Sequence, residues 1–263
     1  MLLKDKVLIV SGIGPGLGVK LAIEGAREGV RGLVVSARTA EKLDDAEKRV
    51  REVNPSCKVL KLTTDIRDAA QCRKLADTAQ AQFGRIDGLI NSGFFWGTPG
   101  AADTAELDGW KDVLETNVIG TMRMTQAVVP FMKKQGGGAI VNISSMATVK
   151  PHEGEIGYAA SKGALNVFSK YLASELGPSN IRVNVARMGW MLGVPVQNYV
   201  SYAAKQQGVP EKQFYDAIAA NIPLRRLVTD TECARVALFL ISDYASAVTG
   251  AVVDANGGEF LPL

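Results

Sequence analysis

The sequence predicts an α/β protein in one doubly wound domain, with a seven-stranded parallel sheet and helices on both faces. Short apolar, β-branched segments alternate with longer segments of helical period, which is the pattern of consecutive β-α-β units. The alternation covers the whole chain of 263 residues, and no linker rich in Pro, Gly or Ser interrupts it. Parallel strands joined by helices need right-handed crossovers, so a single layered sheet is the economical architecture.

The individual elements follow from short apolar runs and from helical periodicity, taken in chain order. Buried strands are expected at residues 6–10, 32–36, 59–62, 88–91, 139–143, 180–185 and 251–254. Helices are expected at residues 16–28, 40–53, 69–83, 107–134, 158–176 and 230–242. Asn54-Pro55 ends the second helix, because proline disfavours the helical conformation of the residue before it. The segment at about 190–226 is too long for an ordinary connection, so we expect a substrate lid within the single domain formed by residues 1–263.

Composition limits the classes to which the protein can belong. The chain is 47% hydrophobic and 22% charged, as in ordinary globular proteins. Its 30 Lys and Arg against 27 Asp and Glu give a net charge of +3, too weak a field to suggest a nucleic-acid partner. No apolar segment is long enough to span a bilayer, and Lys4-Asp5-Lys6 comes too early for a signal peptide, so we expect a cytoplasmic protein without a membrane partner.

The cysteines indicate neither a disulfide framework nor a metal site. Cys57, Cys72 and Cys233 are odd in number and scattered, and their spacing matches no set of metal ligands. We therefore expect reduced thiols and no metal.

A glycine-rich loop follows the first expected strand and opens the first helix. Glycine lets the backbone turn tightly and approach a pyrophosphate, whose charge meets the unpaired N–H groups at the start of the helix. A turn that only packs helix on strand is the alternative, but the position between strand and helix favours dinucleotide binding. The expected cofactor-binding residues here are Ser11, Gly12, Gly14, Gly16, Leu17 and Gly18.

The residue after the second strand indicates which dinucleotide binds. An acidic residue at this place would select NAD through the ribose 2′-hydroxyl. The sequence instead has Arg38, whose guanidinium can pair with a 2′-phosphate and stack on adenine. NADP is therefore the expected cofactor, with NAD as the alternative. Arg38 could also be a solvated residue at the end of a strand that binds no cofactor.

Three polar side chains form the expected catalytic group. Tyr158 and Lys162 lie one helical turn apart, and a nearby cation stabilises a phenolate and so lowers the pKa of a tyrosine. This spacing alone also arises by chance. Ser145 follows the fifth strand, whose carboxyl end faces the cofactor crevice, so its hydroxyl can hold a substrate carbonyl beside Tyr158.

With these motifs in this order, the chain resembles the classical short-chain dehydrogenase/reductase family over essentially its whole length. The family's T-G-x-x-x-G-x-G pattern matches residues 11–18 with serine in place of threonine, and its N-x-G pattern matches Asn91-Ser92-Gly93. The aspartate of the adenine pocket falls on Asp65, which Ile66 follows, and the family's helix asparagine falls on Asn117. The resemblance implies a Rossmann-type domain that binds NAD(P).

The resemblance also implies an activity, namely hydride transfer between nicotinamide and a secondary alcohol or ketone. Tyr158 would be the general acid or base, and Ser145 would orient the substrate oxygen. Lys162 would bind the nicotinamide ribose and lower the pKa of the tyrosine, while Asn117 would support a water relay to that lysine. Family resemblance further implies a homotetramer that uses the two long helices, and the apolar residues 260–263 are expected to be buried against a neighbouring subunit.

Two departures from the family pattern follow the sixth strand. Met188 stands where the family has proline, and Gly193 where it has a threonine that contacts the nicotinamide carboxamide. Gly189 is retained, so it is the one residue of this loop that we expect to contact the cofactor.

Large apolar side chains lie near the expected hydride site in the sequence. They predict a pocket for a hydrophobic or cyclic substrate, and packing within the lid and loops is the alternative. His152, the only histidine, is expected at the rim of this pocket rather than in the chemistry. The apolar candidates are Phe94, Phe95, Trp96, Met146, Trp190 and Met191.

The same residues leave other functions open. One is an NAD-linked dehydrogenase of the same family that acts on a dihydrodiol or a steroid-like alcohol. Another is a cofactor-sensing binding protein, and a third is a methyltransferase with a glycine-rich loop. Neither of the last two needs a proton donor such as Tyr158, so the catalytic set favours an NADP(H)-preferring oxidoreductase.

Overall fold

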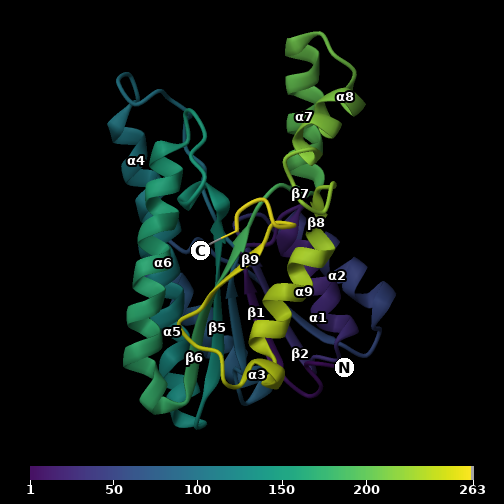
Figure 1. Cartoon of the computed structure of the whole chain (residues 1–263). Coiled ribbons are helices and arrows are strands. Elements are labelled where there is room, and N and C mark those ends of the chain that lie inside the picture. Colours follow the sequence, from purple (N-terminus) through teal and green to yellow (C-terminus); the bar gives the residue numbers. More distant parts are fainter. Residues whose placement is uncertain (262–263) are drawn as a thin grey trace.

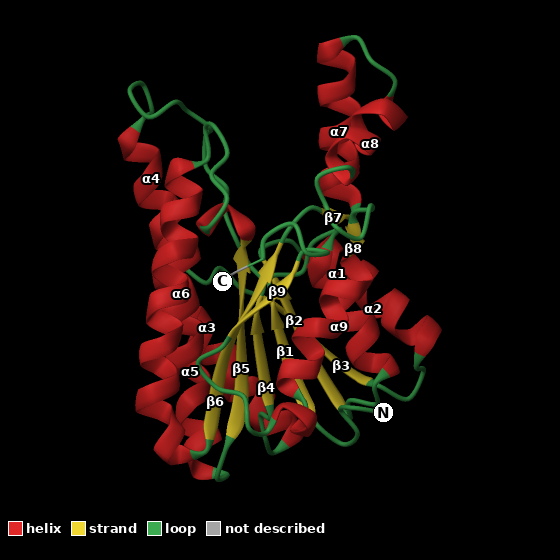
Figure 2. Cartoon of the chain, in the orientation of Figure 1, coloured by secondary structure: helices red, strands yellow, loops and turns green. Residues whose placement is uncertain are grey.

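The computed structural model describes residues 1–261 and confirms one seven-stranded parallel sheet (Figures 1 and 2). The strand order reverses between β1 and β4, which makes that junction the switch point of the sheet. From edge to edge the strands are β3 (Lys58–Thr63), β2 (Gly32–Ala37), β1 (Val7–Ser11), β4 (Gly88–Asn91), β5 (Gly138–Ser145), β6 (Ile181–Met188) and β9 (Val252–Ala255).

Helices cover both faces of this sheet, as expected (Figure 2). One face carries α1 (Leu17–Arg27), α2 (Ala40–Val53) and α9 (Asp230–Ile241). The other carries α3 (Ala69–Phe83), α4 (Leu107–Leu114), α5 (Thr121–Lys134) and α6 (Ile156–Leu176). Short 3-10 turns lie at Met146–Thr148, Gly177–Ser179 and Asp243–Ala245.

Strand β1 shows why the sequence pattern was continuous rather than alternating. Leu8 and Val10 pack in the core under α1 and α9, whereas Val7 and Ile9 pack in the core under α3 and α5. Because successive side chains point to opposite faces and both faces are covered, the strand is apolar at every position before Ser11.

The long helix expected at residues 107–134 is not one regular α-helix. A π-helical segment, Glu115–Gly120, separates α4 from α5. A Cβ on Gly120 would lie 2.8 Å from Ile66, so the absence of a side chain lets this segment approach the loop after β3. Such wide turns occur mostly at functional sites, and this one carries the buried Asn117.

The segment after β6 leaves the core, as expected from its length. It contains β7 (Met191–Leu192), α7 (Val194–Gln207), α8 (Glu211–Ala219) and β8 (Val228–Thr229), and β7 pairs with β8 in a separate two-stranded sheet. Figure 1 shows α7 and α8 rising above the carboxyl ends of the main strands. A small core of Ala219, Ile222 and Leu227, with Trp190 packed against it, holds this segment together.

The expected burial of residues 260–263 against a neighbouring subunit stays a prediction. The ring of Phe260 lies 4.9 Å from the guanidinium carbon of Arg187 in the same chain, so an aromatic contact within the chain holds it. Pro262 and Leu263 lie outside the described residues.

Within residues 1–261 no helix is both long and apolar enough to cross a membrane.

The three cysteines are free and buried. Burial raises the pKa of the Cys57 and Cys72 thiols to about 11 and that of the Cys233 thiol to about 12. Thiols with such high pKa values are poor nucleophiles at neutral pH.

Candidate active site

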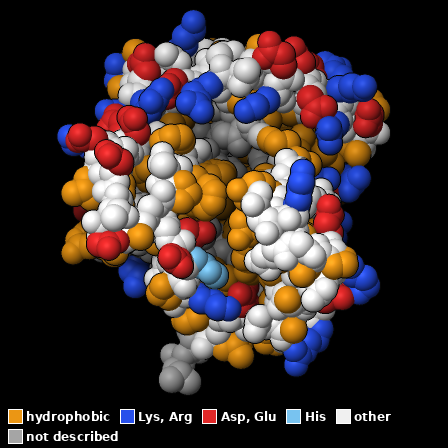
Figure 3. Space-filling model, turned by 90° about the horizontal axis from the view of Figure 1, so that it is seen from above, with side chains coloured by type: hydrophobic (Ala, Val, Ile, Leu, Met, Phe, Trp, Pro, Cys, Tyr) orange, Lys and Arg blue, Asp and Glu red, His pale blue; other side chains and the backbone are white. Residues whose placement is uncertain are grey.

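A cleft of about 450 Å³ lies at the carboxyl ends of the strands, beside the switch point of the sheet. Figure 3 looks down on this end of the molecule and shows its surface hollowed between raised rims. Asn91 does not line the cleft, because its amide donates a hydrogen bond of 2.8 Å to Asn142 inside the sheet. The expected cofactor residues that do line it are Ser11, Gly12, Gly14, Gly16, Leu17, Gly18, Arg38, Asp65, Ile66, Gly93, Tyr158, Lys162 and Gly189.

The glycines of the loop after β1 have different physical roles. Gly12 has φ 103°, and a Cβ on it would lie 2.1 Å from the backbone nitrogen of Gly93. A Cβ on Gly18 would lie 2.3 Å from the carbonyl oxygen of Gly12, so both glycines are required by the packing of the chain itself. Gly14 has no atom within 4 Å of its Cβ position, so a side chain there would fill open space in the cleft.

The cleft therefore fits a dinucleotide. Gly14 leaves room for a pyrophosphate, and α1 begins at Leu17 with no side chain bonded to its first backbone N–H groups. Those N–H groups and the helix dipole favour an anion at this end.

The end of the cleft beside β2 and β3 is rich in cations. Arg38, Lys42 and Arg67 all line it. Asp65 forms an ion pair of 2.7 Å with Arg67, and that guanidinium holds the pKa of the carboxyl below its usual range. Sequence reasoning missed Lys42 and Arg67, although Lys42 lies in the first turn of the helix that follows Arg38, which is a position that could have identified it.

Lys162 is buried at the centre of the site. Its side chain extends from α6, and the residue is only 4% exposed. The ammonium donates a hydrogen bond of 2.8 Å to the carbonyl of Ile143 and lies 5.8 Å from the ring centroids of both Tyr158 and Phe94. Burial lowers the pKa of Lys162 to about 8, so most of these side chains remain charged at neutral pH.

Tyr158 behaves differently from the expectation. Burial raises the pKa of its phenol to about 12, and a hydrogen bond with Ser145 offsets only part of that rise. Removing the phenolate from water costs more than this hydrogen bond recovers, and the expected lowering by Lys162 does not accompany it. In the protein alone Tyr158 is therefore protonated at neutral pH.

Asn117 holds the loop after β4. Its Nδ2 donates hydrogen bonds of 2.9 Å to the Phe95 carbonyl and to Ser161 Oγ, while its Oδ1 accepts one of 2.7 Å from the Phe95 backbone N–H. These contacts fix the chain that carries Phe94 into the cleft, where its ring meets Tyr158 edge-on at 6.2 Å. The water relay expected for Asn117 stays a prediction.

The expected substrate residues separate into three groups. Phe94 and Met191 line the cleft. His152 and Trp190 line a second cavity. Phe95, Trp96 and Met146 line neither cavity. Phe95 and Trp96 extend from an exposed loop, and Met146 is buried in the core.

Of the two departures from the family pattern, Met188 and Gly193, the structure explains Gly193. Met188 lines the cleft beside Gly189. At position 193 a Cβ would lie 2.9 Å from the carboxylate of Asp230, so a threonine would clash where glycine fits. Gly193 therefore provides no side chain for a carboxamide.

The chain is similar to known oxidoreductases over nearly its whole length. A family model described as enoyl-(acyl carrier protein) reductase matches residues 12–259. The 3-oxoacyl-(acyl-carrier-protein) reductase of Thermotoga maritima is 33% identical over 258 residues, which cover 98% of this chain and 99% of that protein. Both matches span nearly the whole chain.

Solved structures of oxidoreductases also superpose on nearly the whole chain. L-sorbose reductase from Gluconobacter frateurii, complexed with NADPH and L-sorbose, superposes with a TM-score of 0.92 at 28% identity and covers 100% of this chain and 99% of its own. NAD⁺-bound xylitol dehydrogenase superposes with a TM-score of 0.89 at 30% identity. The match covers 98% of this chain and 100% of the xylitol dehydrogenase chain. The chain therefore belongs to the short-chain dehydrogenase/reductase family of oxidoreductases.

Proposed function

We propose that the protein interconverts secondary alcohols and ketones with NADP(H) as its preferred cofactor, and that its substrate is hydrophobic or cyclic. The observation that carries this proposal is that Ser145, Tyr158 and the buried Lys162 line the same cleft, which fits a dinucleotide. The bound nicotinamide would supply or accept the hydride.

The chain's own residues then handle the proton and the oxygen. In reduction, the Tyr158 hydroxyl donates its proton to the carbonyl oxygen, and Ser145 donates a hydrogen bond to the same oxygen. The Lys162 ammonium stabilises the phenolate that remains. Because burial already raises the pKa of Tyr158, the resting state is the one that reduction needs.

A panel of ketones and secondary alcohols, assayed with NADPH, NADH and the oxidised cofactors, tests the proposal. Turnover of a cyclic ketone with NADPH is the expected result. Tight binding of NADPH without oxidation by any ketone would favour the cofactor-sensing protein, and methyl transfer in place of hydride transfer would contradict the family chemistry.

The reductive and oxidative rates should respond oppositely to pH. Oxidation needs the phenolate, so its kcat/KM should rise by up to about tenfold per pH unit between about pH 6 and 8. Reduction needs the phenol and the Lys162 ammonium, so its kcat/KM should be flat below pH 8 and fall above it, since the pKa of Lys162 is about 8. Profiles in both directions check this, and superimposable profiles would contradict it.

The preference for NADP(H) is supported by the cations beside β2 and β3. Arg38 lines this end of the cleft with Lys42 and Arg67, while the charge of Asp65 is already paired. Arg38→Ala should lower kcat/KM for NADPH about 10- to 100-fold more than that for NADH, because adenine stacking is common to both cofactors and only NADPH has the 2′-phosphate that pairs with the guanidinium.

Steady-state assays with both cofactors measure this effect. Arg49→Ala is the control, since Arg49 pairs with Asp45 on the outer face of α2 and does not line the cleft. An unchanged ratio of NADPH to NADH efficiency in Arg38→Ala would show that the cofactor argument is wrong.

We also infer a homotetramer. Exposed apolar side chains extend along the helical layer of α4 to α6, and such surfaces are commonly buried between subunits. They include Leu114, Ile119, Val167 and Tyr171. Sedimentation equilibrium would test this, and a monomer at micromolar concentration would contradict it.

A further inference from the structure

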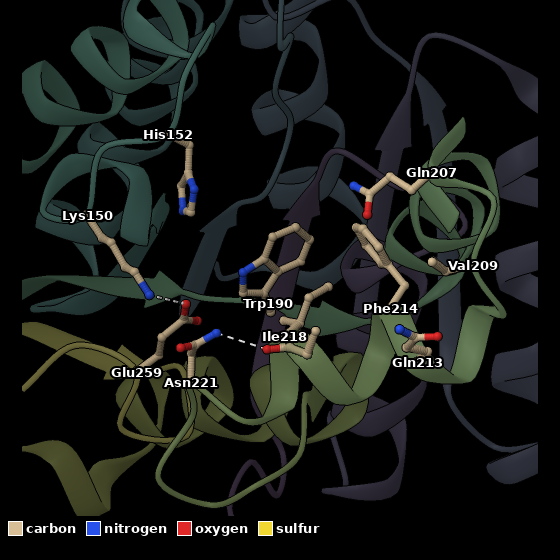
Figure 4. Close-up of a pocket in the computed structure, with 11 residues that line it drawn as sticks. Lys150, His152, Trp190, Gln207, Val209, Gln213, Phe214, Ile218, Asn221 and Glu259 are labelled. Atoms are coloured by element: carbon tan, nitrogen blue, oxygen red, sulfur yellow. Dashed lines mark hydrogen bonds and ion pairs between the residues drawn. The ribbon is translucent and has the colours of Figure 1, made fainter. Parts of the chain in front are cut away.

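A second cavity, of about 350 Å³, lies between the lid helices and the body of the protein (Figure 4). It adjoins the cofactor cleft, because Trp190 lines this cavity while its neighbours Gly189 and Met191 line the cleft. The residues before α6 contribute His152, and the segment after β9 contributes Glu259. No expected catalytic residue lines the cavity, so it is separate from the site of proton transfer.

One wall of the cavity is aromatic. His152, Trp190 and Phe214 line it, and the rings of His152 and Trp190 meet edge-on at 6.2 Å. Tyr199 does not line the cavity but joins two of these rings, at 5.7 Å from Trp190 and 6.2 Å from Phe214. A flat apolar ring or chain that extended from the cleft would pack well against this wall.

The floor of the cavity holds a buried carboxylate. The side chain of Glu259 is 2% exposed, and its Oε1 accepts a hydrogen bond of 2.7 Å from Lys150 Nζ. Its Oε2 is also buried, and no atom of residues 1–261 donates a hydrogen bond to it. A buried carboxylate oxygen without a donor is unfavourable, so the structure indicates a missing partner that carries an O–H or N–H group.

The charges around Glu259 narrow the chemistry of that partner. The Lys150 ammonium already balances the charge of Glu259, so a charged partner of either sign would add an uncompensated charge beside this ion pair. The amides of Gln207, Gln213 and Asn221, which also line the cavity, are neutral. A neutral hydroxyl therefore fits the site best, because it can donate to Oε2 and accept from an amide.

We propose that this cavity is a distal substrate subsite, in which Glu259 accepts a hydrogen bond from a hydroxyl group while Trp190 packs against the apolar part of the substrate. The inference rests on the proposed function, which places the reacting carbonyl at Tyr158. It names the substrate class as hydroxylated cyclic ketones and the corresponding diols.

Matched ketones test the inference. Cyclohexanone, decalone and a four-ring ketone would each be assayed with hydrogen, hydroxyl or methoxy on the ring carbon farthest from the carbonyl. Methoxy keeps the oxygen but cannot donate. The wild-type protein should prefer hydroxyl over methoxy in kcat/KM by at least about tenfold in the framework whose length reaches Glu259.

Glu259→Gln is the informative variant. Its amide oxygen can still accept from Lys150, but the NH2 group that then faces the cavity is a donor, so the preference for hydroxyl over methoxy should fall about tenfold. Glu211→Gln is the control, because Glu211 is exposed on the lid and does not line the cavity, and it should keep the wild-type preference. Thermal unfolding and NADPH affinity of both variants establish that they are folded.

The outcomes separate this inference from the proposed function. Equal hydroxyl-to-methoxy ratios in wild type and Glu259→Gln would overturn the subsite, while turnover of the ketones would still support the oxidoreductase. If wild type turns over no ketone, the proposed function fails, and calorimetric binding of the same compounds to the NADPH complex decides the subsite. Tighter binding of the hydroxyl compound that is lost in Glu259→Gln supports it, and equal binding overturns it.

Discussion

Tyr158→Phe should reduce kcat by about 10³-fold in both directions, because it removes the only atom that exchanges a proton with the substrate oxygen in the proposed reaction. The ring remains, so its edge-on contact with Phe94 is kept. NADPH affinity should change little, since the phenol acts on the reacting oxygen rather than on the phosphates. Stopped-flow single turnovers and fluorescence titration with NADPH measure the two quantities separately.

Tyr244→Phe provides the matched control, because the side chain of Tyr244 is exposed in the 3-10 turn after α9 and lines neither cavity. It should keep wild-type activity. A Tyr158→Phe protein that retained more than about a tenth of the wild-type kcat would rule out the phenol as the proton donor, because a lost general acid costs at least about a hundredfold.

The layered sheet was predictable because it depends on local pattern. A strand such as β1, covered on both faces, is apolar without a break from Val7 to Val10, and a helix such as α2 is apolar on one face only. These patterns are visible without any knowledge of tertiary contacts. The π-helical segment was not predictable, since it depends on how closely Gly120 approaches Ile66, a residue far away in the sequence.

The site was predictable in its parts but not in its electrostatics. Motif spacing placed Ser145, Tyr158 and Lys162 together, and the structure brings them to one cleft. The pKa of Tyr158 is raised because burial outweighs the hydrogen bond with Ser145, and burial depends on the packing of the whole site. Glu259 was missed for a similar reason, because its pairing with Lys150 joins residues 109 positions apart in sequence.

Lys162→Met should make the protein without cofactor more stable and at the same time almost inactive. Burial lowers the pKa of Lys162 from its ordinary value of 10.5 to about 8, so the folded state binds this proton less tightly than the unfolded chain does. Methionine has a similar length and no charge, so it avoids the cost of burying an ammonium. Activity should fall at least about a hundredfold, because no cation then stabilises the phenolate of Tyr158.

The sign and size of the stability change follow from proton linkage. Between pH 8 and 10.5 the unfolded chain holds more protons than the folded protein, so the stability contributed by Lys162 is lowest below pH 8 and rises with pH through this window. At pH 7 the variant should therefore gain about 2 kcal/mol in the free energy of unfolding, since about 1.4 kcal/mol per pKa unit is offset in part by the lost hydrogen bond to Ile143. Urea unfolding at pH 7 and at about pH 10 measures it.

Comparison across pH distinguishes this cause from a general packing effect. The advantage of Lys162→Met should shrink as pH approaches 10.5, because the wild-type lysine is then neutral in the folded state and its burial costs little. Lys170→Met, on the exposed side of the same helix, should show no such dependence. If Lys162→Met were no more stable than wild type at pH 7, the ammonium would have to be solvated in the cleft. A gain at pH 7 that disappears at high pH would mean that the fold is less stable because it carries the charge that the reaction requires.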